Sequence, residues 1–144
     1  MAVNFYEDVD DALLKFAVII AKTEGKYVLC KHKERNTLEV PGGHREPGEE
    51  IIATAKRELY EETGATSFTI KPICVYSVSA DNSLSGQLSF GMLYFAEISS
   101  FEKELHSEIE KIVITDKLPD KDYWTYPQIQ PKLLEEARRR GFEA

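Results

Sequence analysis

The sequence predicts an α+β fold in which a mixed β-sheet lies between helices. Several runs rich in branched and aromatic residues have the length and composition of strands. Two other segments repeat apolar residues at helical spacing, one in the middle of the chain and one near its end. The chain has 144 residues, 42% of them hydrophobic and 30% charged, which is enough to bury an ordinary core. We therefore expect residues 1–144 to form a single domain.

The first two predicted strands form a hairpin. Residues 13–21 (LLKFAVIIA) and 26–31 (KYVLCK) are rich in branched and aromatic side chains. Thr23, Glu24 and Gly25 lie between them and are typical of a turn. The two strands are therefore expected to pair with each other.

The segment after the hairpin is predicted to end in a loop. Residues 36–40 lead to residues 41–43 (PGG), a turn cluster that stops regular pairing. Pro47 and Gly48 mark a second turn. Residues 41–48 are therefore expected to connect a strand to the helix that follows.

Residues 49–63 (EEIIATAKRELYEET) are predicted to form that helix. Ile52, Ala55 and Leu59 recur at i, i+3 and i+7, which gives the helix one apolar face. The segment begins with two glutamates, where the helix dipole favours negative charge, and Gly64 follows as a left-handed cap.

The rest of the chain is predicted to add three strands and a second helix. Residues 67–79 and 87–98 form two long strands separated by the polar loop 80–86, and residues 109–115 form another. The second helix, 127–140, carries one apolar stripe and three arginines in its last turn. The apolar stripe consists of Ile129, Leu133, Leu134 and Ala137. This order predicts the mixed sheet with a helix packed on each side.

Charge and composition argue against several classes of partner and location. The formal net charge of −7 argues against a long nucleic acid, which binds through many basic residues. No apolar stretch approaches the roughly 18 residues of a membrane span. Cys30 and Cys74 lie in apolar runs without the spacing of a metal or redox site, so we expect buried, reduced thiols and a cytoplasmic protein.

The predicted middle helix concentrates carboxylates. Glu58, Glu61 and Glu62 lie at i, i+3 and i+4, so their side chains emerge on one side of the helix. Like-charge pairs at this spacing cost about 0.2–0.5 kcal/mol each, so local stability gives no reason to collect them. Hard divalent cations would balance the charge, since Mg²⁺ takes carboxylate oxygens and shares its coordination shell with substrate phosphates. For the glutamates alone, a solvated helix face is the alternative interpretation.

The residues around these glutamates follow a fixed pattern. From Gly43 to Ala65 the chain reads GHREPGEEIIATAKRELYEETGA. The first glycine, the glutamate six residues later, the REL run, the EE pair and the last glycine all stand at the spacing of the Nudix motif. The chain therefore resembles the Nudix (MutT-like) hydrolase family, with Ala65 in the apolar position that closes the motif. This resemblance implies an α/β/α sandwich in which the motif forms a loop, a helix and a loop.

The resemblance also implies a metal site. One to three Mg²⁺ or Mn²⁺ ions would be held by Glu58, Glu61, Glu62 and the backbone carbonyl of Gly43. A diphosphate resists attack because its oxygens repel a nucleophile, whereas bound cations withdraw that charge and acidify a coordinated water. The implied activity is hydrolysis of a diphosphate linkage in a small, nucleotide-like molecule.

The predicted catalytic residues are Glu58, Glu61 and Arg57, with one acidic residue from outside the motif. Arg57, together with Glu49, would orient the metal ligands. In the family, either a motif glutamate or an acidic residue of a distant loop takes the proton from water. Glu58 is the preferred base within the motif, and Glu108 is the preferred outside candidate. Glu104 is the other outside candidate, and a charged surface loop is the alternative interpretation for both.

Aromatic strand residues are the candidates for binding a base. We expect Tyr76 and Phe90 to contact the substrate, and Trp124 and Tyr126 are further candidates near the last helix. Packing in the core is the alternative interpretation for all of them.

The three histidines show no metal-ligand spacing. His32 and His106 lie outside the motif. His44 lies inside the motif loop, where it could touch a phosphate, although an exposed histidine is the simpler interpretation.

The leading functional hypothesis is hydrolysis of a nucleoside triphosphate to the monophosphate and diphosphate. Oxidised purine nucleoside triphosphates are included among the candidate substrates. The hypothesis rests on the compact length, which is like that of the MutT type. One alternative is removal of diphosphate from an RNA 5′ end, against which the acidic charge counts. Another is a noncatalytic Nudix domain that senses a nucleotide, against which the complete glutamate set counts. The absence of a proline about fifteen residues beyond Ala65 weakens the interpretation that ADP-ribose is the substrate. The family resemblance is also compatible with a homodimer.

Overall fold

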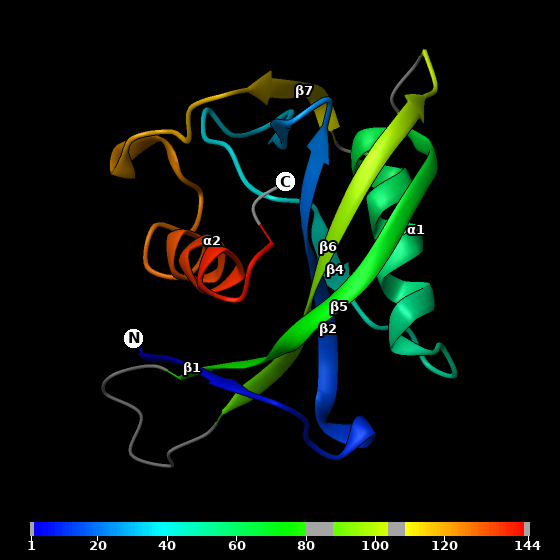
Figure 1. Cartoon of the computed structure of the whole chain (residues 1–144), viewed down its shortest axis with the longest axis vertical. Helices are drawn as coiled ribbons and strands as arrows, with labels where there is room; N and C mark the ends of the chain where they lie inside the picture. Colours follow the sequence, from blue (N-terminus) through cyan, green and yellow to red (C-terminus); the bar gives the residue numbers. More distant parts are fainter. Residues whose placement is uncertain (1, 80–87, 104–108, 143–144) are drawn as a thin grey trace.

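The computed structural model describes residues 2–79, 88–103 and 109–142. A mixed β-sheet lies between helix α1 (Ile51–Thr63) and helix α2 (Gln130–Arg139), one on each face (Figure 1). The predicted α+β class, with a helix packed on each side of the sheet, is confirmed. No helix among the described residues is long and apolar enough to cross a bilayer.

Among the described residues the sheet contains seven strands, and the central one, β2, has a parallel neighbour. Their order in space is β1-β5-β6-β2-β3-β7, and β4 pairs with β2 away from this path. β2 runs parallel to β6, and the other paired strands are antiparallel. In chain order the strands are β1 (Ala2–Tyr6), β2 (Leu14–Thr23), β3 (Lys26–His32), β4 (Gly42–His44), β5 (Ala65–Ser79), β6 (Ser89–Phe101) and β7 (Ile109–Thr115).

Alternating side chains of β2 supply both halves of the core. Ala17 and Ile19 pack in a cluster with Leu59 of α1. Ile20, the next residue along the strand, packs in a second cluster with Leu133 of α2. The alternation follows from the two-residue period of a strand. Burying Leu59 or Leu133 stabilises the fold by about 1.5–3 kcal/mol each. Because both leucines pack against β2, this one strand anchors both helices.

The predicted hairpin is confirmed, although its strands pair only beside the turn. Lys22 lies opposite Tyr27, and the turn residues Glu24 and Gly25 have φ of 49° and 79°. Two positive φ values match the tight turn whose twist suits a hairpin. Farther from the turn β2 pairs with β4 instead, and β3 pairs with β7. The two hairpin strands therefore diverge.

The expected turn at residues 41–43 was wrong in its second half, because Gly42 and Gly43 belong to β4. A Cβ on Gly42 would lie 2.6 Å from the carbonyl oxygen of Ala17, so glycine allows β4 to approach β2 closely. Residues 36–40, which lead into this turn, do not form the regular strand that a strand-to-helix loop at 41–48 would follow. This segment forms only isolated bridges, one of them between Cys30 and Glu39.

Strand β1 was not predicted. Its residues AVNFY precede an acidic stretch, and they pair with the end of β5 from Ala2 opposite Ser79 to Tyr6 opposite Val75. This pairing depends on a distant strand, and the local composition gave no sign of it.

The helix boundaries differ from prediction by a few residues. α1 begins at Ile51 because Glu50, its N-cap, is extended with ψ of 146°. Gly64 ends it with φ of 77°, and its N–H donates to the carbonyl oxygen of Tyr60 at 2.8 Å, as the predicted left-handed cap requires. α2 begins at Gln130 and ends at Arg139. The loop predicted at 80–86 lies outside the described residues.

Candidate functional site

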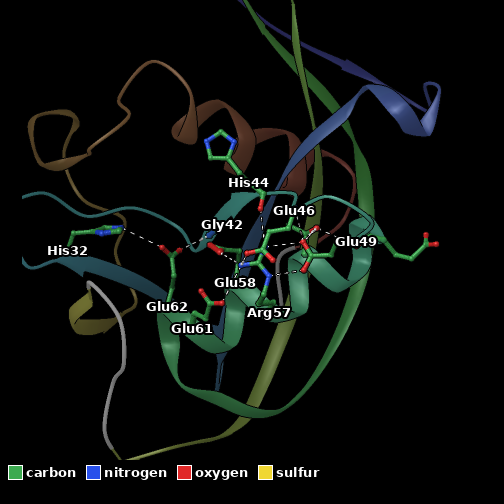
Figure 2. Close-up of polar contacts among 11 residues, drawn as sticks. His32, Gly42, His44, Glu46, Glu49, Arg57, Glu58, Glu61 and Glu62 are labelled. Atoms are coloured by element: carbon green, nitrogen blue, oxygen red, sulfur yellow. Dashed lines mark hydrogen bonds and ion pairs between the residues drawn. The ribbon is translucent and has the colours of Figure 1, made fainter.

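Glutamates of α1 meet the backbone of β4 at one side of the sheet (Figure 2). The closest approach is between Gly43 and Glu58: a Cβ on Gly43 would overlap the Glu58 carboxylate. Gly43 is therefore required for the close approach of this carboxylate to the strand, and not only for a turn.

Arg57 lies among the carboxylates and binds several of them. Its Nη1 donates to Glu58 at 2.7 Å and to Glu61 at 3.3 Å. Its Nε and Nη2 donate to the two oxygens of Glu49 at 2.7 and 3.0 Å. Nη2 also donates to the backbone oxygen of His44 at 3.0 Å, which ties the helix to the end of β4. One guanidinium thus fixes the positions of three glutamates.

Glu49 is the most strongly hydrogen-bonded of these carboxylates. Besides Arg57, the backbone N–H of Glu46 donates to it at 3.1 Å and the hydroxyl of Thr54 at 2.7 Å. These bonds, with that of Arg57 first, lower the pKa of Glu49 to about 2. Glu49 therefore stays charged and keeps Arg57 in place, which is the orienting position predicted for it.

Glu62 is the most deeply buried glutamate of α1, with 9% of its surface exposed. One carboxylate oxygen accepts a hydrogen bond from the backbone N–H of Gly42 at 2.8 Å. Burial raises the pKa of Glu62 to about 8, and the nearby carboxylates of Glu58 and Glu39 add to this, against the effect of the Gly42 hydrogen bond. In Figure 2 the other oxygen points toward His32.

Glu58 and Glu61 complete the carboxylate group. Glu58 is half-buried, and burial followed by the charge of Glu61 raises its pKa, while Arg57 opposes the shift. The side chain of Glu61 is more exposed, at 40%. Carboxylates therefore outnumber the single arginine at this site, and a divalent cation with oxygen ligands would balance them.

A cavity of about 420 Å³ opens beside these carboxylates, between the sheet and α2. Its size suits a small ligand. Glu62 and the backbone of Gly42 and Gly43 form its polar side. Its apolar lining combines aliphatic side chains with three aromatic ones, Phe16, Tyr76 and Tyr126.

The structure brings together most of the site residues predicted from the sequence. Gly43, Arg57 and the three glutamates of α1 are in or beside one cluster. Tyr76 lines the adjoining cavity and is almost fully buried. Phe90 instead packs its ring on Tyr6, with centroids 5.5 Å apart, and does not line the cavity.

Other predicted residues lie elsewhere. Glu104, His106 and Glu108 are outside the described residues. The indole nitrogen of Trp124 donates to the carbonyl oxygen of Pro119 at 3.1 Å, and the ring belongs to the core on the α2 side. His44 is exposed, and its ring stacks edge-on against Phe16 at 6.2 Å.

Sequence reasoning missed His32 and Glu39. His32 ends β3, and Glu39 is brought beside it because this segment bridges back to Cys30. Their ligand atoms gather with one oxygen of Glu62 within 4.8 Å of one another. His32 has no metal-ligand spacing in the sequence, and only the fold brings it beside the two carboxylates. Sequence spacing could not show this, because the three residues come from three separate segments.

The NUDIX domain family matches residues 13–113 of the chain. Two curated relatives come from Bacillus subtilis (strain 168). One, provisionally named the 8-oxo-dGTP diphosphatase YtkD, is 33% identical over 107 residues, which cover 74% of this chain and 65% of that protein. The other, an ADP-ribose pyrophosphatase, is 31% identical over 109 residues, which cover 71% of this chain and 59% of that protein. The chain thus spans less than two thirds of the length of either relative.

A solved structure is similar over almost the whole chain. The crystal structure of a variant of the Bacillus subtilis pyrophosphohydrolase BsRppH superposes with a TM-score of 0.79 and 26% sequence identity. The match covers 99% of this chain and 93% of that one. The predicted α/β/α sandwich is therefore also the fold of a known pyrophosphohydrolase.

Proposed function

This chain belongs to the NUDIX domain family, and we propose that it is a metal-dependent hydrolase that cuts a diphosphate linkage in a nucleotide. The observation that carries the proposal is the carboxylate cluster of α1. Glu58 and Glu62 lie against β4, Arg57 joins Glu58 to Glu61, and a ligand-sized cavity lies alongside. The negative charges of these carboxylates repel one another, and a divalent cation with oxygen ligands would balance them.

The family generally uses divalent metal cations, and the residues of this chain fit one. The space that a Cβ on Gly43 would fill is taken by the Glu58 carboxylate, so this carboxylate lies directly against the backbone of the motif loop. Mg²⁺ or Mn²⁺ would be held by Glu58, Glu61, Glu62 and the backbone carbonyl of Gly43. When bound, such a cation withdraws charge from phosphate oxygens and acidifies water.

The side chains of the cluster have distinct roles in this proposal. Arg57, fixed by Glu49, holds Glu58 and Glu61 in position. Glu58 accepts the proton of the water that attacks phosphorus, and its raised pKa makes it a stronger base than an exposed glutamate. The bridging oxygen then leaves with the departing phosphate. Glu108 remains the predicted alternative base.

A nucleoside triphosphate is the substrate that the cavity favours. Glu62, Gly42 and Gly43 line the same cavity as Tyr76 and Tyr126, so a phosphate site and an aromatic site adjoin. Flat aromatic faces suit a nucleobase, and the volume suits a single small molecule. The relative named for 8-oxo-dGTP hydrolysis supports an oxidised purine triphosphate as the first to test.

A second candidate substrate is the triphosphorylated 5′ end of an RNA. The likeness to a pyrophosphohydrolase over 99% of the chain supports it. The net charge of −7 limits the contacts that a longer RNA could make, so only the terminal nucleotides would be held.

A substrate panel in Mg²⁺ and in Mn²⁺ tests both candidates. It contains ordinary and oxidised nucleoside triphosphates, ADP-ribose, a nucleotide sugar and a short triphosphorylated RNA, and released diphosphate and phosphate are measured. We expect diphosphate from a triphosphate, with turnover at least about 100-fold lower for Glu58→Gln because base and ligand are both lost. Glu50→Gln is the matched control, since Glu50 is an exposed glutamate at the start of the same helix, and it should keep wild-type turnover.

The other outcomes of the panel are also decisive. Turnover of the RNA alone would select the second candidate. Turnover of a nucleotide sugar and of no triphosphate would reject both substrates while keeping the reaction. Tight binding of a nucleotide without any hydrolysis would overturn the enzyme assignment in favour of a sensing domain.

A further inference from the structure

His32, Glu39 and Glu62 form a compact group of metal-ligating side chains beside the glutamate cluster. His32 ends β3, Glu39 precedes β4 and Glu62 belongs to α1. We propose that these three residues bind a transition-metal ion such as Zn²⁺ or Mn²⁺ at a site distinct from that of the motif glutamates. His32 and Glu39 lie outside the motif, and the two sites share only Glu62.

The separations of the ligand atoms match those around a single ion. The Nε2 atom of His32 lies 2.7 Å from one oxygen of Glu39 and 3.6 Å from one oxygen of Glu62. All three atoms lie within 4.8 Å of one another. With metal–ligand bonds of about 2.0–2.2 Å, neighbouring ligand atoms lie about 3.0–3.5 Å apart and opposite ones about 4.2 Å. An ion therefore fits between the three atoms after small shifts.

Each carboxylate has one oxygen fixed by another group and one directed to the centre. In Glu39 the fixed oxygen accepts from Nη1 of Arg35 at 3.0 Å, while the other faces His32. In Glu62 the fixed oxygen accepts from the backbone N–H of Gly42 at 2.8 Å, while the other faces His32. Partners of this kind orient metal ligands before the ion arrives.

The Nε2 atom of His32 is buried, and although it lies 2.7 Å from an oxygen of Glu39, it makes no hydrogen bond of acceptable geometry with the described residues. It nevertheless points toward the carboxylate of Glu62 (Figure 2). A buried polar atom that makes no hydrogen bond needs an explanation, and a cation between the nitrogen and the two carboxylates supplies one. The three residues also line the 420 Å³ cavity, so the site has an open side for water or a substrate oxygen.

The nitrogen ligand distinguishes this site from an all-oxygen one. Imidazole suits Zn²⁺, carboxylate oxygens suit Mn²⁺, and this site offers both, whereas Mg²⁺ prefers carboxylate, carbonyl and water oxygens. The chain is therefore expected to bind Zn²⁺ more tightly than Mg²⁺. This inference does not require that the chain be a hydrolase.

Pulsed electron paramagnetic resonance of Mn²⁺ bound to the full chain tests the site, because it detects a coordinated imidazole nitrogen. We expect a nitrogen coupling in the wild type that disappears in His32→Gln. His44→Gln is the matched control, since His44 lines the same cavity and lies outside the group, and it should keep the coupling. Zn²⁺ affinity, measured by calorimetry, should fall at least about tenfold in His32→Gln and in Glu39→Gln, with Mg²⁺ affinity little changed.

The results separate this inference from the proposed function. A nitrogen coupling that depends on His32, in a protein that hydrolyses none of the panel, would support the site and reject the hydrolase. Hydrolysis by a wild-type protein whose Mn²⁺ shows no nitrogen coupling would reject the site and leave the hydrolase standing. Unchanged Zn²⁺ affinity in both His32→Gln and Glu39→Gln would also overturn the proposed metal site. If His32→Gln does not fold, the wild-type spectrum and Glu39→Gln decide the question.

Discussion

At the scale of single residues, the site depends on the contact between Gly43 and Glu58. A side chain at position 43 would occupy the volume of the Glu58 carboxylate. The glutamate would have to rotate away, which would also break its hydrogen bond with Arg57 at 2.7 Å. The glycine of the motif therefore acts on the chemistry through one specific neighbour.

Gly43→Ala is expected to lower turnover about as much as Glu58→Gln does. The reason is that both changes remove the Glu58 carboxylate from its position, while the fold should persist. The double variant should then be little worse than either single variant, because residues that act through one contact are not additive. Steady-state rates of the three proteins check this. Multiplied losses in the double variant would show that Gly43 acts independently of Glu58.

The buried carboxylate of Glu62 makes the stability of the metal-free protein depend on pH. Its pKa is raised from 4.5 to about 8, so the folded state holds a proton that the unfolded state releases. Below pH 4.5 the Glu62 carboxyl is protonated in both the folded and the unfolded state, so it does not lower the free energy of unfolding. Stability falls as the pH rises from about 4.5 to 8, and above pH 8 the full cost is present.

Glu62→Gln should therefore stabilise the metal-free protein above pH 8, by on the order of 1–3 kcal/mol. Glutamine is neutral and can still accept the Gly42 hydrogen bond. The difference from wild type should shrink toward zero near pH 5, and saturating Mn²⁺ should reduce or reverse it at high pH. Chemical denaturation in EDTA at pH 5 and pH 9 measures this. An equal difference at both values would mean that the charge of Glu62 is not the cause.

At the scale of elements, α1 is a scaffold with two different sides. Ala55 and Leu59 are fully buried against the sheet, whereas Glu58 and Glu61 emerge toward β4 and solvent. The buried side fixes where the carboxylates stand. Packing of the helix and geometry of the site are therefore coupled.

Leu59→Ala is expected to destabilise the protein by about 2–5 kcal/mol, because it leaves a cavity between α1 and the sheet. Lys56→Ala, on the exposed side of the same helix, should change stability by less than about 0.5 kcal/mol. Denaturant unfolding of both variants makes the comparison. Similar small effects in both would contradict the packing of α1 described above.

The sequence predicted the elements whose signals are local. The apolar stripe of α1 and the cap at Gly64 are both short-range, and so are the strand pattern of β2 and the arginines that end α2. β4 could not be predicted, since Gly42 and Gly43 are typical of a turn and become a strand only through pairing with β2. β1 likewise depends on a partner strand about 70 residues away, since Ala2 lies opposite Ser79 and Tyr6 opposite Val75.

At the scale of the whole molecule, the sheet order determines which side chains meet. The motif placed Arg57 and the three glutamates on one helix, so that part of the site was predictable from spacing. His32 and Glu39 join Glu62 only because β3 leaves β2 after the turn and the following segment folds back to Cys30. No periodicity in the sequence encodes this meeting. The same topology places α2 over the other face and creates the cavity beside the carboxylates.

The most direct test of the central claim is a crystal structure of the chain with Mn²⁺ and a nonhydrolysable nucleotide, with the ion located by its anomalous signal. We expect a manganese peak within about 2–2.5 Å of the Glu58 or Glu62 carboxylate that also contacts a phosphate oxygen of the nucleotide. A nucleotide bound in the cavity with no ion beside either glutamate would contradict it.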